Sequence, residues 1–185
     1  MAMISVLQYF YFAIFLQFVP LQSVKTGATY YYQSKSEQSI YIMDFISVNK
    51  LKNKTIYKIR CSSYNFRNNR STNRLYAEII KYPSLTYIKS VTNQYGSKIL
   101  KSPILLSKNK SKLYLKPDNK FVLYKKASYK HRFSLIKNLV GLNSIKHIYR
   151  RNKAQTVVII SKKIGLLKFY FKKNKPALRF IGKTK

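Results

Sequence analysis

The chain has 185 residues, of which 37 are Lys or Arg and four are Asp or Glu, so its formal net charge at pH 7 is +33. This excess cannot be neutralised within the chain and opposes compaction, so we expect an external polyanion, most commonly nucleic acid, to supply countercharge. Hydrophobic residues make up 46% and aromatic residues 15% of the sequence, which excludes a disordered basic tail of low hydrophobicity.

The first predicted element is an uncharged apolar helix within residues 1–24. The run from Ile4 to Val19 is broken only by one serine and two glutamines, and Pro20 ends it. The run is a little shorter than the roughly 20 residues of a membrane-spanning helix, and it lacks the basic start of a secretory signal. Three roles stay open: docking against a neighbouring protein, anchoring to a membrane, or acting as an uncleaved targeting element.

Residues 25–100 carry β-prone stretches and one basic loop. Segments 39–42 and 55–59 are rich in β-branched and aromatic residues with partial alternation, which predicts two strands. The polar segment 61–74 contains three arginines and predicts a turn. It is either a solvated loop or a loop that inserts into RNA, and the total charge favours RNA.

The charge is unevenly divided along the chain. Residues 1–100 hold 13 Lys and Arg and three acids, which leaves +10, while residues 101–185 hold 24 and one acid, which leaves +23. The shorter part therefore carries most of the charge. We place the boundary between an extension and a core domain near Gly96.

Residues 101–175 show the pattern of a compact α+β domain. Strands are expected at 121–124, 132–136 and 156–160, the last being a continuous Val/Ile-rich run typical of a buried strand. A basic turn at 150–153 precedes that run.

The order of these pieces resembles the small-subunit ribosomal protein S-nineteen family (universal uS-nineteen type). The family's Lys-Gly-Pro-Phe opening corresponds to Lys101–Ile104, and its Arg-Ser-Thr-Ile strand corresponds to Arg132–Ile136. Its Ile/Val-Gly motif corresponds to Val140–Leu142, followed about six residues on by His147. A basic turn and a Val/Ile-rich strand come next. The Gly-His-Lys-Leu-Gly-Glu-Phe closing motif corresponds to Gly165–Phe171, with the first Gly and the final Phe at the same spacing.

The resemblance covers about 80 residues and departs from the family at several positions. The first His of the closing motif is Leu166 here, and its second Gly and its Glu are Phe169 and Tyr170. The family's Asn-Gly turn is Ile148–Tyr149. The first 100 residues are not covered.

The resemblance implies an α+β fold. We expect a small C-terminal domain with a short antiparallel sheet and a helix, preceded by an N-terminal extension with an apolar helix and short strands. The expected division is an uncharged segment 1–24, a lineage-specific extension 25–100, an rRNA-binding domain 101–175 and a basic tail 176–185.

The resemblance also implies a structural constituent of the small ribosomal subunit that binds small-subunit rRNA in the head. Its neighbours would include an S-thirteen-type protein, with the decoding-site tRNA near the tail. The bias toward Lys, Asn, Ile, Tyr and Phe is typical of an AT-rich genome such as an organelle's, so we expect a divergent mitochondrial member in the matrix. Two alternatives are another or lineage-specific mitoribosomal protein, and a membrane-anchored basic RNA-binding adaptor.

The candidate RNA contacts are cations that cluster around the expected strands and turns, where the other interpretation is a solvated turn. They are Lys101, Lys108, Lys110, Lys112, Lys125, Lys126, Arg132, Arg150, Arg151, Lys153, Lys162, Lys163, Lys168, Lys172, Lys173 and Lys175. The tail cations Arg179, Lys183 and Lys185 would lie nearest the tRNA. Phe169, Tyr170 and Phe171 could stack on unpaired bases, although Phe171 is favoured as a core residue.

Nothing in the sequence predicts catalysis, a metal site or a cofactor. The four acids are scattered and form no acid–base pair, and no phosphate-binding loop or nucleophile motif is present. Cys61 is the single cysteine and is expected to be a buried small hydrophobe. His147 is expected to be structural, and Gly141 and Gly165 are expected to give the backbone freedom at turns.

Overall fold

The computed structural model describes residues 6–71, 74–100, 102–106, 110, 112–116, 119–135, 138–171 and 178–184. Its helix α1 (Val6–Phe18) lies within the expected apolar run. The helix ends just before Pro20, with the amide of Val19 donating to the carbonyl of Phe15 at 2.9 Å. A single 3-10 turn, Leu21–Ser23, follows and leads the chain into the first strand.

The strands form one antiparallel sheet. Its first-half strands are β1 (Thr29–Ser34), β2 (Ser39–Leu51), β3 (Lys54–Asn65), β4 (Arg70–Ser71), β5 (Leu75–Lys81), β6 (Thr86–Asn93) and β7 (Ile104–Leu106). Its second-half strands are β8 (Lys112–Lys116), β9 (Asn119–Leu135), β10 (Asn138–Arg151), β11 (Ala154–Ser161), β12 (Gly165–Phe171) and β13 (Leu178–Thr184). The order is β7-β6-β5-β3-β2-β1-β13-β12-β11-β10-β9-β8, with β4 added beside β3.

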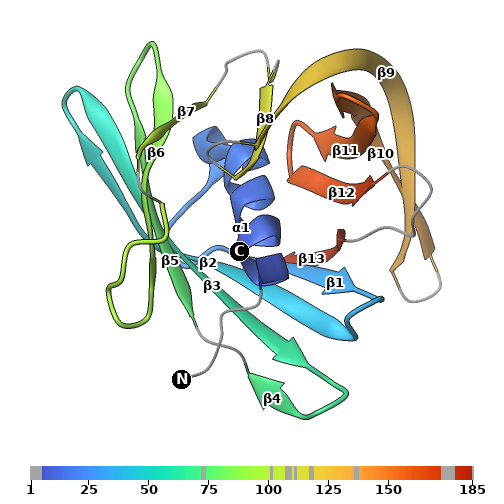
Figure 1. Cartoon of the computed structure of the whole chain (residues 1–185), viewed down its shortest axis with the longest axis horizontal. Coiled ribbons are helices and arrows are strands. Elements are labelled where there is room, and N and C mark those ends of the chain that lie inside the picture. The colour runs from blue at the N-terminus through green and yellow to red at the C-terminus, as the bar shows by residue number, and fades with distance from the viewer. Residues whose placement is uncertain are drawn as a thin grey trace.

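The sheet is built from hairpins, and its first and last strands in the sequence, β1 and β13, pair at its centre. β1 pairs with β13 through partners such as Tyr30 and Lys183, with a bulge between Tyr31 and Tyr32. β1 also pairs with β2, and β13 with β12. Figure 1 shows the result: the sheet curves around α1, which lies in the middle of the molecule.

The core lies between α1 and the concave face of the sheet. Side chains on β1 alternate strictly, so Tyr30 and Tyr32 are fully buried while their neighbours are half-buried. Phe15 of α1 contacts Tyr30 and Tyr32 with ring centroids 5.5 and 5.7 Å apart, and Phe45 of β2 at 6.3 Å. These tilted and edge-to-face contacts stabilise the core beyond simple area burial.

The expected α+β fold is wrong. The described part of residues 102–171 consists of strands β7 to β12 and contains no helix, and the whole described chain forms one large antiparallel sheet around α1. The expected short strands are parts of long ones: residues 39–42 lie in β2, 55–59 in β3 and 156–160 in β11. The basic turn at 150–153 joins β10 and β11 in a tight hairpin.

Helix α1 is covered by other parts of its own chain. The helix is apolar on every side, because Phe12, Ile14, Phe15 and Leu16 are all at most 1% exposed, and such a helix must be covered all round. Its cover is this chain's own sheet, which the sequence did not predict. No described helix has the length and apolar character needed to cross a membrane.

The sheet continues across the expected boundaries. β7 pairs with β6 across residue 100, and β13 carries the expected tail into the centre of the sheet. The division of the chain into these four parts stays a prediction.

Candidate functional site: basic hairpins and a lysine-lined cavity

Three of the four acids have partners in the structure. Asp44 forms an ion pair with Arg60 at 2.8 Å, and Glu78 forms one with Lys89 at 2.8 Å. The carboxylate of Glu37 accepts hydrogen bonds from the hydroxyls of Tyr11 and Tyr41. Since four acids face 37 cations, ion pairing leaves the charge excess intact, and it must be balanced from outside the chain.

The tip of the β10–β11 hairpin is the most concentrated predicted site. Arg150, Arg151 and Lys153 are all exposed around a two-residue turn, in which Asn152 has a φ of +51°. Asparagine tolerates this left-handed conformation better than most residues. The guanidinium of Arg150 lies 3.4 Å from the ring centroid of Tyr124 on β9. The side chain of Tyr124 is 59% exposed. This tip therefore presents a cation and an aromatic face together.

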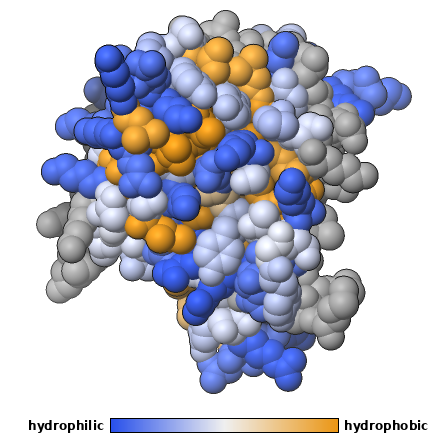
Figure 2. All heavy atoms as spheres, turned by 90° about the vertical axis from the view of Figure 1, so that its left-hand side faces the viewer, coloured by the Kyte–Doolittle hydropathy of each residue, from blue (hydrophilic) through white to orange (hydrophobic). Residues whose placement is uncertain are grey.

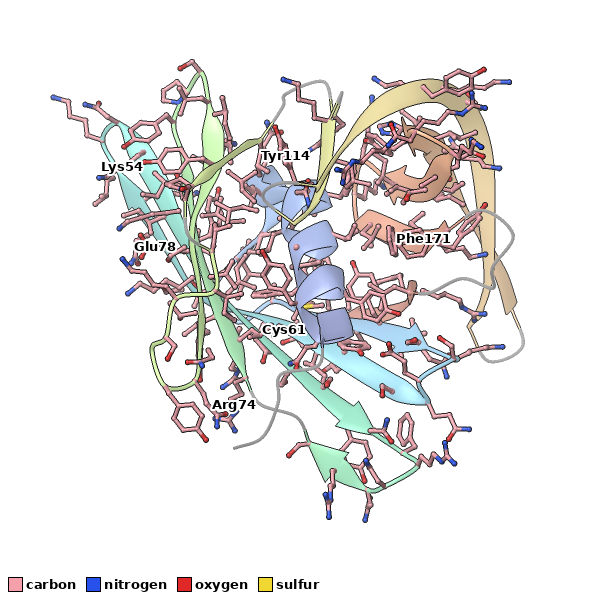
Figure 3. All side chains as sticks on the ribbon, in the orientation of Figure 1. Lys54, Cys61, Arg74, Glu78, Tyr114 and Phe171 are labelled. Atoms are coloured by element: carbon pink, nitrogen blue, oxygen red, sulfur yellow. The ribbon has the colours of Figure 1, made fainter. Side chains whose placement is uncertain are left out.

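A second basic tip follows β3. Arg67, Arg70 and Arg74 are exposed around it, and Phe66 is 53% exposed with its ring 5.3 Å from that of Tyr64. It corresponds to the expected basic loop. Among the labelled residues of Figure 3, Arg74 lies toward this lower end, while Lys54 lies at the opposite tip between β2 and β3. The cations are therefore spread over both ends of the sheet.

The outer face of the first-half strands mixes apolar and charged side chains. Figure 2 shows separate hydrophobic patches between hydrophilic residues on this side of the molecule. The exposed large apolar residues of these strands and turns include Ile46, Leu51, Leu85 and Leu105. Scattered exposed apolar residues are usual on protein surfaces.

The predicted RNA-contact residues fall into four groups. Those that are exposed are Lys112, Lys125, Lys126, Arg150, Arg151, Lys153, Lys162 and Lys163, and those that are half-buried are Lys110, Lys168, Arg179 and Lys183. Arg132 lies in β9, and its side chain is outside the described part. Lys101, Lys108, Lys172, Lys173, Lys175 and Lys185 lie outside the described residues.

Two cations of the expected tail lie within the sheet. Arg179 pairs in register with Lys168 of β12, and burial together with Arg179 lowers the pKa of Lys168. The ammonium of Lys183 lies 4.9 Å from the ring centroid of Tyr30. We therefore describe both residues as part of strand β13 rather than of an extended tail.

Lys110 has a structural role that the sequence did not reveal. Its ammonium donates to the carbonyl of Gln17 at 2.6 Å, in the last turn of α1, and lies 5.6 Å from the ring centroid of Phe18. A cation at this end complements the negative end of the helix dipole. Burial lowers the pKa of Lys110. The phosphate contact expected for this residue stays a prediction.

Gly165 and His147 also belong to this end of α1. Gly165 has a φ of +83°, and a Cβ there would lie 2.4 Å from the carbonyl oxygen of Phe18. His147 is 2% exposed and its Nδ1 lies 3.0 Å from the hydroxyl of Tyr149, which donates to the carbonyl of Lys110 at 2.7 Å. Both residues are structural. Gly141, expected at a turn, lies within β10.

A cavity opens where α1 ends, with a volume of about 490 Å³. One wall is the end of α1 and the 3-10 turn, and the others are the β5–β6 turn, the end of β7, Lys110 and the β11–β12 turn. Its lining residues are Leu16, Gln17, Val19, Pro20, Leu21, Gln22, Ser23, Lys81, Tyr82, Pro83, Ser84, Leu85, Thr86, Leu106, Lys110 and Lys162. The residues come from segments far apart in the sequence, so no local motif could have predicted the cavity.

The described residues show no other chemical centre. Among them, no group of three His, Cys, Asp or Glu side chains could hold a metal ion. Cys61 is fully buried, as expected, and burial raises the pKa of its thiol well above the usual range.

Comparison with known proteins identifies no family. No protein-family model and no curated protein sequence matches the chain. A candidate lipoprotein from Parabacteroides distasonis, known from a crystal structure, is similar with a TM-score of 0.48 and 10% sequence identity. The match covers 89% of this chain and 95% of that protein.

Proposed function

We propose that this protein binds RNA as a structural, non-catalytic component of a ribonucleoprotein. The observation that carries the proposal is the net charge of +33, part of which lies on exposed cations at hairpin tips. Each Lys or Arg that neutralises a phosphate releases condensed counterions, which drives binding. The exposed rings of Tyr124 and Phe66 beside these cations offer faces on which unpaired bases can stack.

The β10–β11 tip is the interface we assign to RNA. It combines Arg150, Arg151 and Lys153 with the Arg150–Tyr124 contact. A guanidinium held over a ring is oriented before binding, which lowers the cost of ordering it on a phosphate or base. The helix α1 is covered by the sheet, which favours this proposal over a membrane-anchored adaptor.

The specific form of the proposal is a small-subunit ribosomal protein of mitochondria. Its support is the charge and the composition, because the segments that resemble the S-nineteen family lie in strands of the large sheet rather than in a small α+β domain. Sedimentation through a high-salt gradient tests it: we expect the protein to travel with the small ribosomal subunit. Recovery with large subunits or only with membranes would exclude this form.

RNA binding itself is tested by anisotropy with a labelled structured RNA at several salt concentrations. We expect the logarithm of the affinity to fall linearly with that of the salt concentration, by about 0.7–0.9 per neutralised phosphate. Replacing Arg150, Arg151 and Lys153 by Gln should lower that slope by about two to three.

The matched control replaces Lys50, Lys52 and Lys54 by Gln, which removes the same charge from the opposite tip between β2 and β3. Equal losses in the two variants would show diffuse attraction instead of an interface at the β10–β11 tip. If polyglutamate displaced RNA as well as unlabelled RNA does, the protein would be a general polyanion binder and the proposal would fail.

A further inference from the structure

The cavity at the end of α1 has an apolar wall and a cationic rim. Leu16 is 1% exposed and Val19 is 7% exposed, whereas Leu85 is 41% exposed. All three line the cavity, together with Leu21 and Leu106. The lining therefore runs from the buried core to the surface along aliphatic side chains, which suits a narrow apolar group better than a compact polar one.

Three lysines line the same cavity. Lys81 ends β5, Lys162 lies in the β11–β12 turn, and Lys110 lies between β7 and β8. None of the described lining residues is acidic. Three like charges in the lining of one cavity repel one another, and a bound anion would relieve that repulsion.

Lys110 offsets the negative charge at the end of α1 that would otherwise disfavour an anion in the cavity. The carboxyl end of a helix carries partial negative charge that would repel an anion. The ammonium of Lys110 contacts the carbonyl of Gln17 at 2.6 Å and thereby offsets that charge. Lys81 and Lys162 are the other two cations of the described lining.

We propose that this cavity binds a single-chain amphiphilic anion. Its carboxylate or phosphate would lie at Lys81 and Lys162, and its acyl chain along Leu16, Leu21 and Leu85. The volume of about 490 Å³ lies within the roughly 300–1,000 Å³ of small-molecule sites. A nucleotide is disfavoured because the apolar part of the described lining is mainly aliphatic and contains a single aromatic residue, Tyr82. The site is independent of the proposed RNA interface.

The absence of tryptophan from the chain allows a specific reporter. We would prepare the Leu85→Trp variant, which places one indole in the cavity lining, and titrate it with 12-bromododecanoate, whose bromine quenches indole on contact. The Leu51→Trp variant is the control, since Leu51 is similarly exposed, at 53%, but does not line the cavity. We expect saturable quenching for Leu85→Trp and only collisional quenching for Leu51→Trp.

The chemistry of the ligand is resolved by competition. Dodecanoate and dodecyl phosphate should both displace the brominated probe, and their relative affinity tells a fatty acid from a phosphate-bearing lipid. Dodecanol should bind at least tenfold more weakly, and inorganic phosphate and AMP should not compete. If dodecanol competed as well as dodecanoate, the lysines would not contribute to binding, and the proposal of an anion site would fail. If inorganic phosphate or AMP displaced the probe, the apolar wall would not be needed for binding, and the proposal of an amphiphile would fail.

Paired charge variants separate the cavity from the general attraction of a +33 protein for anions. In the Leu85→Trp background, Lys81→Gln with Lys162→Gln should weaken dodecanoate at least tenfold. The control Lys35→Gln with Lys98→Gln removes the same charge at exposed sites outside the lining, and should change affinity less than twofold. Equal effects in the two pairs would overturn the proposal.

Calorimetric titration of the unmodified protein with dodecanoate, below its micellar concentration, gives a measurement that needs no reporter. We expect one molecule bound per chain. Binding of many molecules per chain, or of none, would contradict a cavity site.

Discussion

Gly165 shows how one residue fixes the approach of two elements. Its φ of +83° lies in the left-handed region, and a Cβ would meet the carbonyl oxygen of Phe18 at 2.4 Å and the Cδ of Pro20 at 2.7 Å. The atom in the way is backbone, so the clash cannot be relieved by turning a side chain. Glycine is therefore required where β12 begins against the end of α1.

We predict that Gly165→Ala lowers the free energy of unfolding by about 3 kcal/mol or more, from left-handed strain of roughly 1–2 kcal/mol plus the clash. Gly96→Ala is the matched control, since Gly96 has a φ of +80° but nothing within 4 Å of an added Cβ. The Gly96→Ala variant should therefore lose only the part of the free energy of unfolding that comes from left-handed strain. Urea unfolding of the two variants measures both values, and equal losses would show that the close approach to Phe18 does not matter.

His147 is a buried imidazole among cations. Burial, then Lys126 and Lys110, lower its pKa from 6.5 to about 4. The unfolded chain therefore binds a proton between these values while the folded chain does not. The contribution of His147 is fully present above pH 6.5 and is lost as the pH falls toward 4.

We predict that this loss amounts to at most about 3.5 kcal/mol, because each tenfold difference in proton affinity between the folded and unfolded chain corresponds to about 1.4 kcal/mol. The free energy of unfolding, measured by urea at pH 7 and pH 4.5, should fall further in the unmodified protein than in His147→Gln, which does not titrate. If both proteins showed the same pH dependence, His147 would accept a proton as readily in the folded state as in the unfolded state.

At the level of elements, a side chain of α1 forms hydrogen bonds with the free backbone edge of strand β8. β8 is the last strand of the sheet, and the side chain of Gln17 takes the place of a further strand neighbour. Its amide donates to the carbonyl of Tyr114 at 2.6 Å, and its oxygen accepts from the amide of Tyr114 at 2.8 Å. An edge with its backbone groups satisfied in this way offers fewer sites for unwanted pairing.

Gln17→Leu keeps the size of the side chain but leaves both backbone groups of Tyr114 without their partner. We expect a loss of about 2–4 kcal/mol, because each unpaired buried group costs roughly 1–3 kcal/mol. Hydrogen exchange at the amide of Tyr114 should become faster. Gln22→Leu serves as the control, since Gln22 is exposed in the 3-10 turn, and it should leave that amide protected.

The strands and the helix differ in how far the sequence could predict them. Local composition was sufficient for β11 and for α1, because a Val/Ile run and an apolar run ended by Pro20 are local signals. The pairing of β1 with β13 joins residues about 150 positions apart, as Tyr30 and Lys183 show, and no local pattern encodes it. The α+β prediction failed because it treated pieces of long strands as separate short elements.

The candidate site divides in the same way. The β10–β11 tip was predictable, since Arg150, Arg151 and Lys153 are adjacent in sequence. The cavity was not, because Lys81 and Lys162 lie in segments far apart in the sequence and line one cavity only in the folded chain. Lys110 was identified by its charge, but its contact with Gln17 could not be predicted because that contact depends on where α1 lies.

At the scale of the whole molecule, the charge sets the conditions under which the fold is stable. The two ion pairs between described residues, Arg60–Asp44 and Lys89–Glu78, leave the net excess of +33 unchanged. Repulsion between the remaining cations is stronger in the compact state than in the expanded one, so it lowers the free energy of unfolding. Salt screens this repulsion over a Debye length of about 10 Å at 0.1 M.

We therefore predict that raising sodium chloride from about 10 to 150 mM increases the free energy of unfolding by roughly 1 kcal/mol or more. Acetylating the exposed lysines provides the control, because it removes charge without changing the core, and the modified protein should respond less to salt. Urea midpoints of both samples measure the difference. A midpoint that falls with salt would mean that attraction within the described ion pairs outweighs repulsion. The fold would then be stable without a polyanion, and the physical reason for expecting one would be lost.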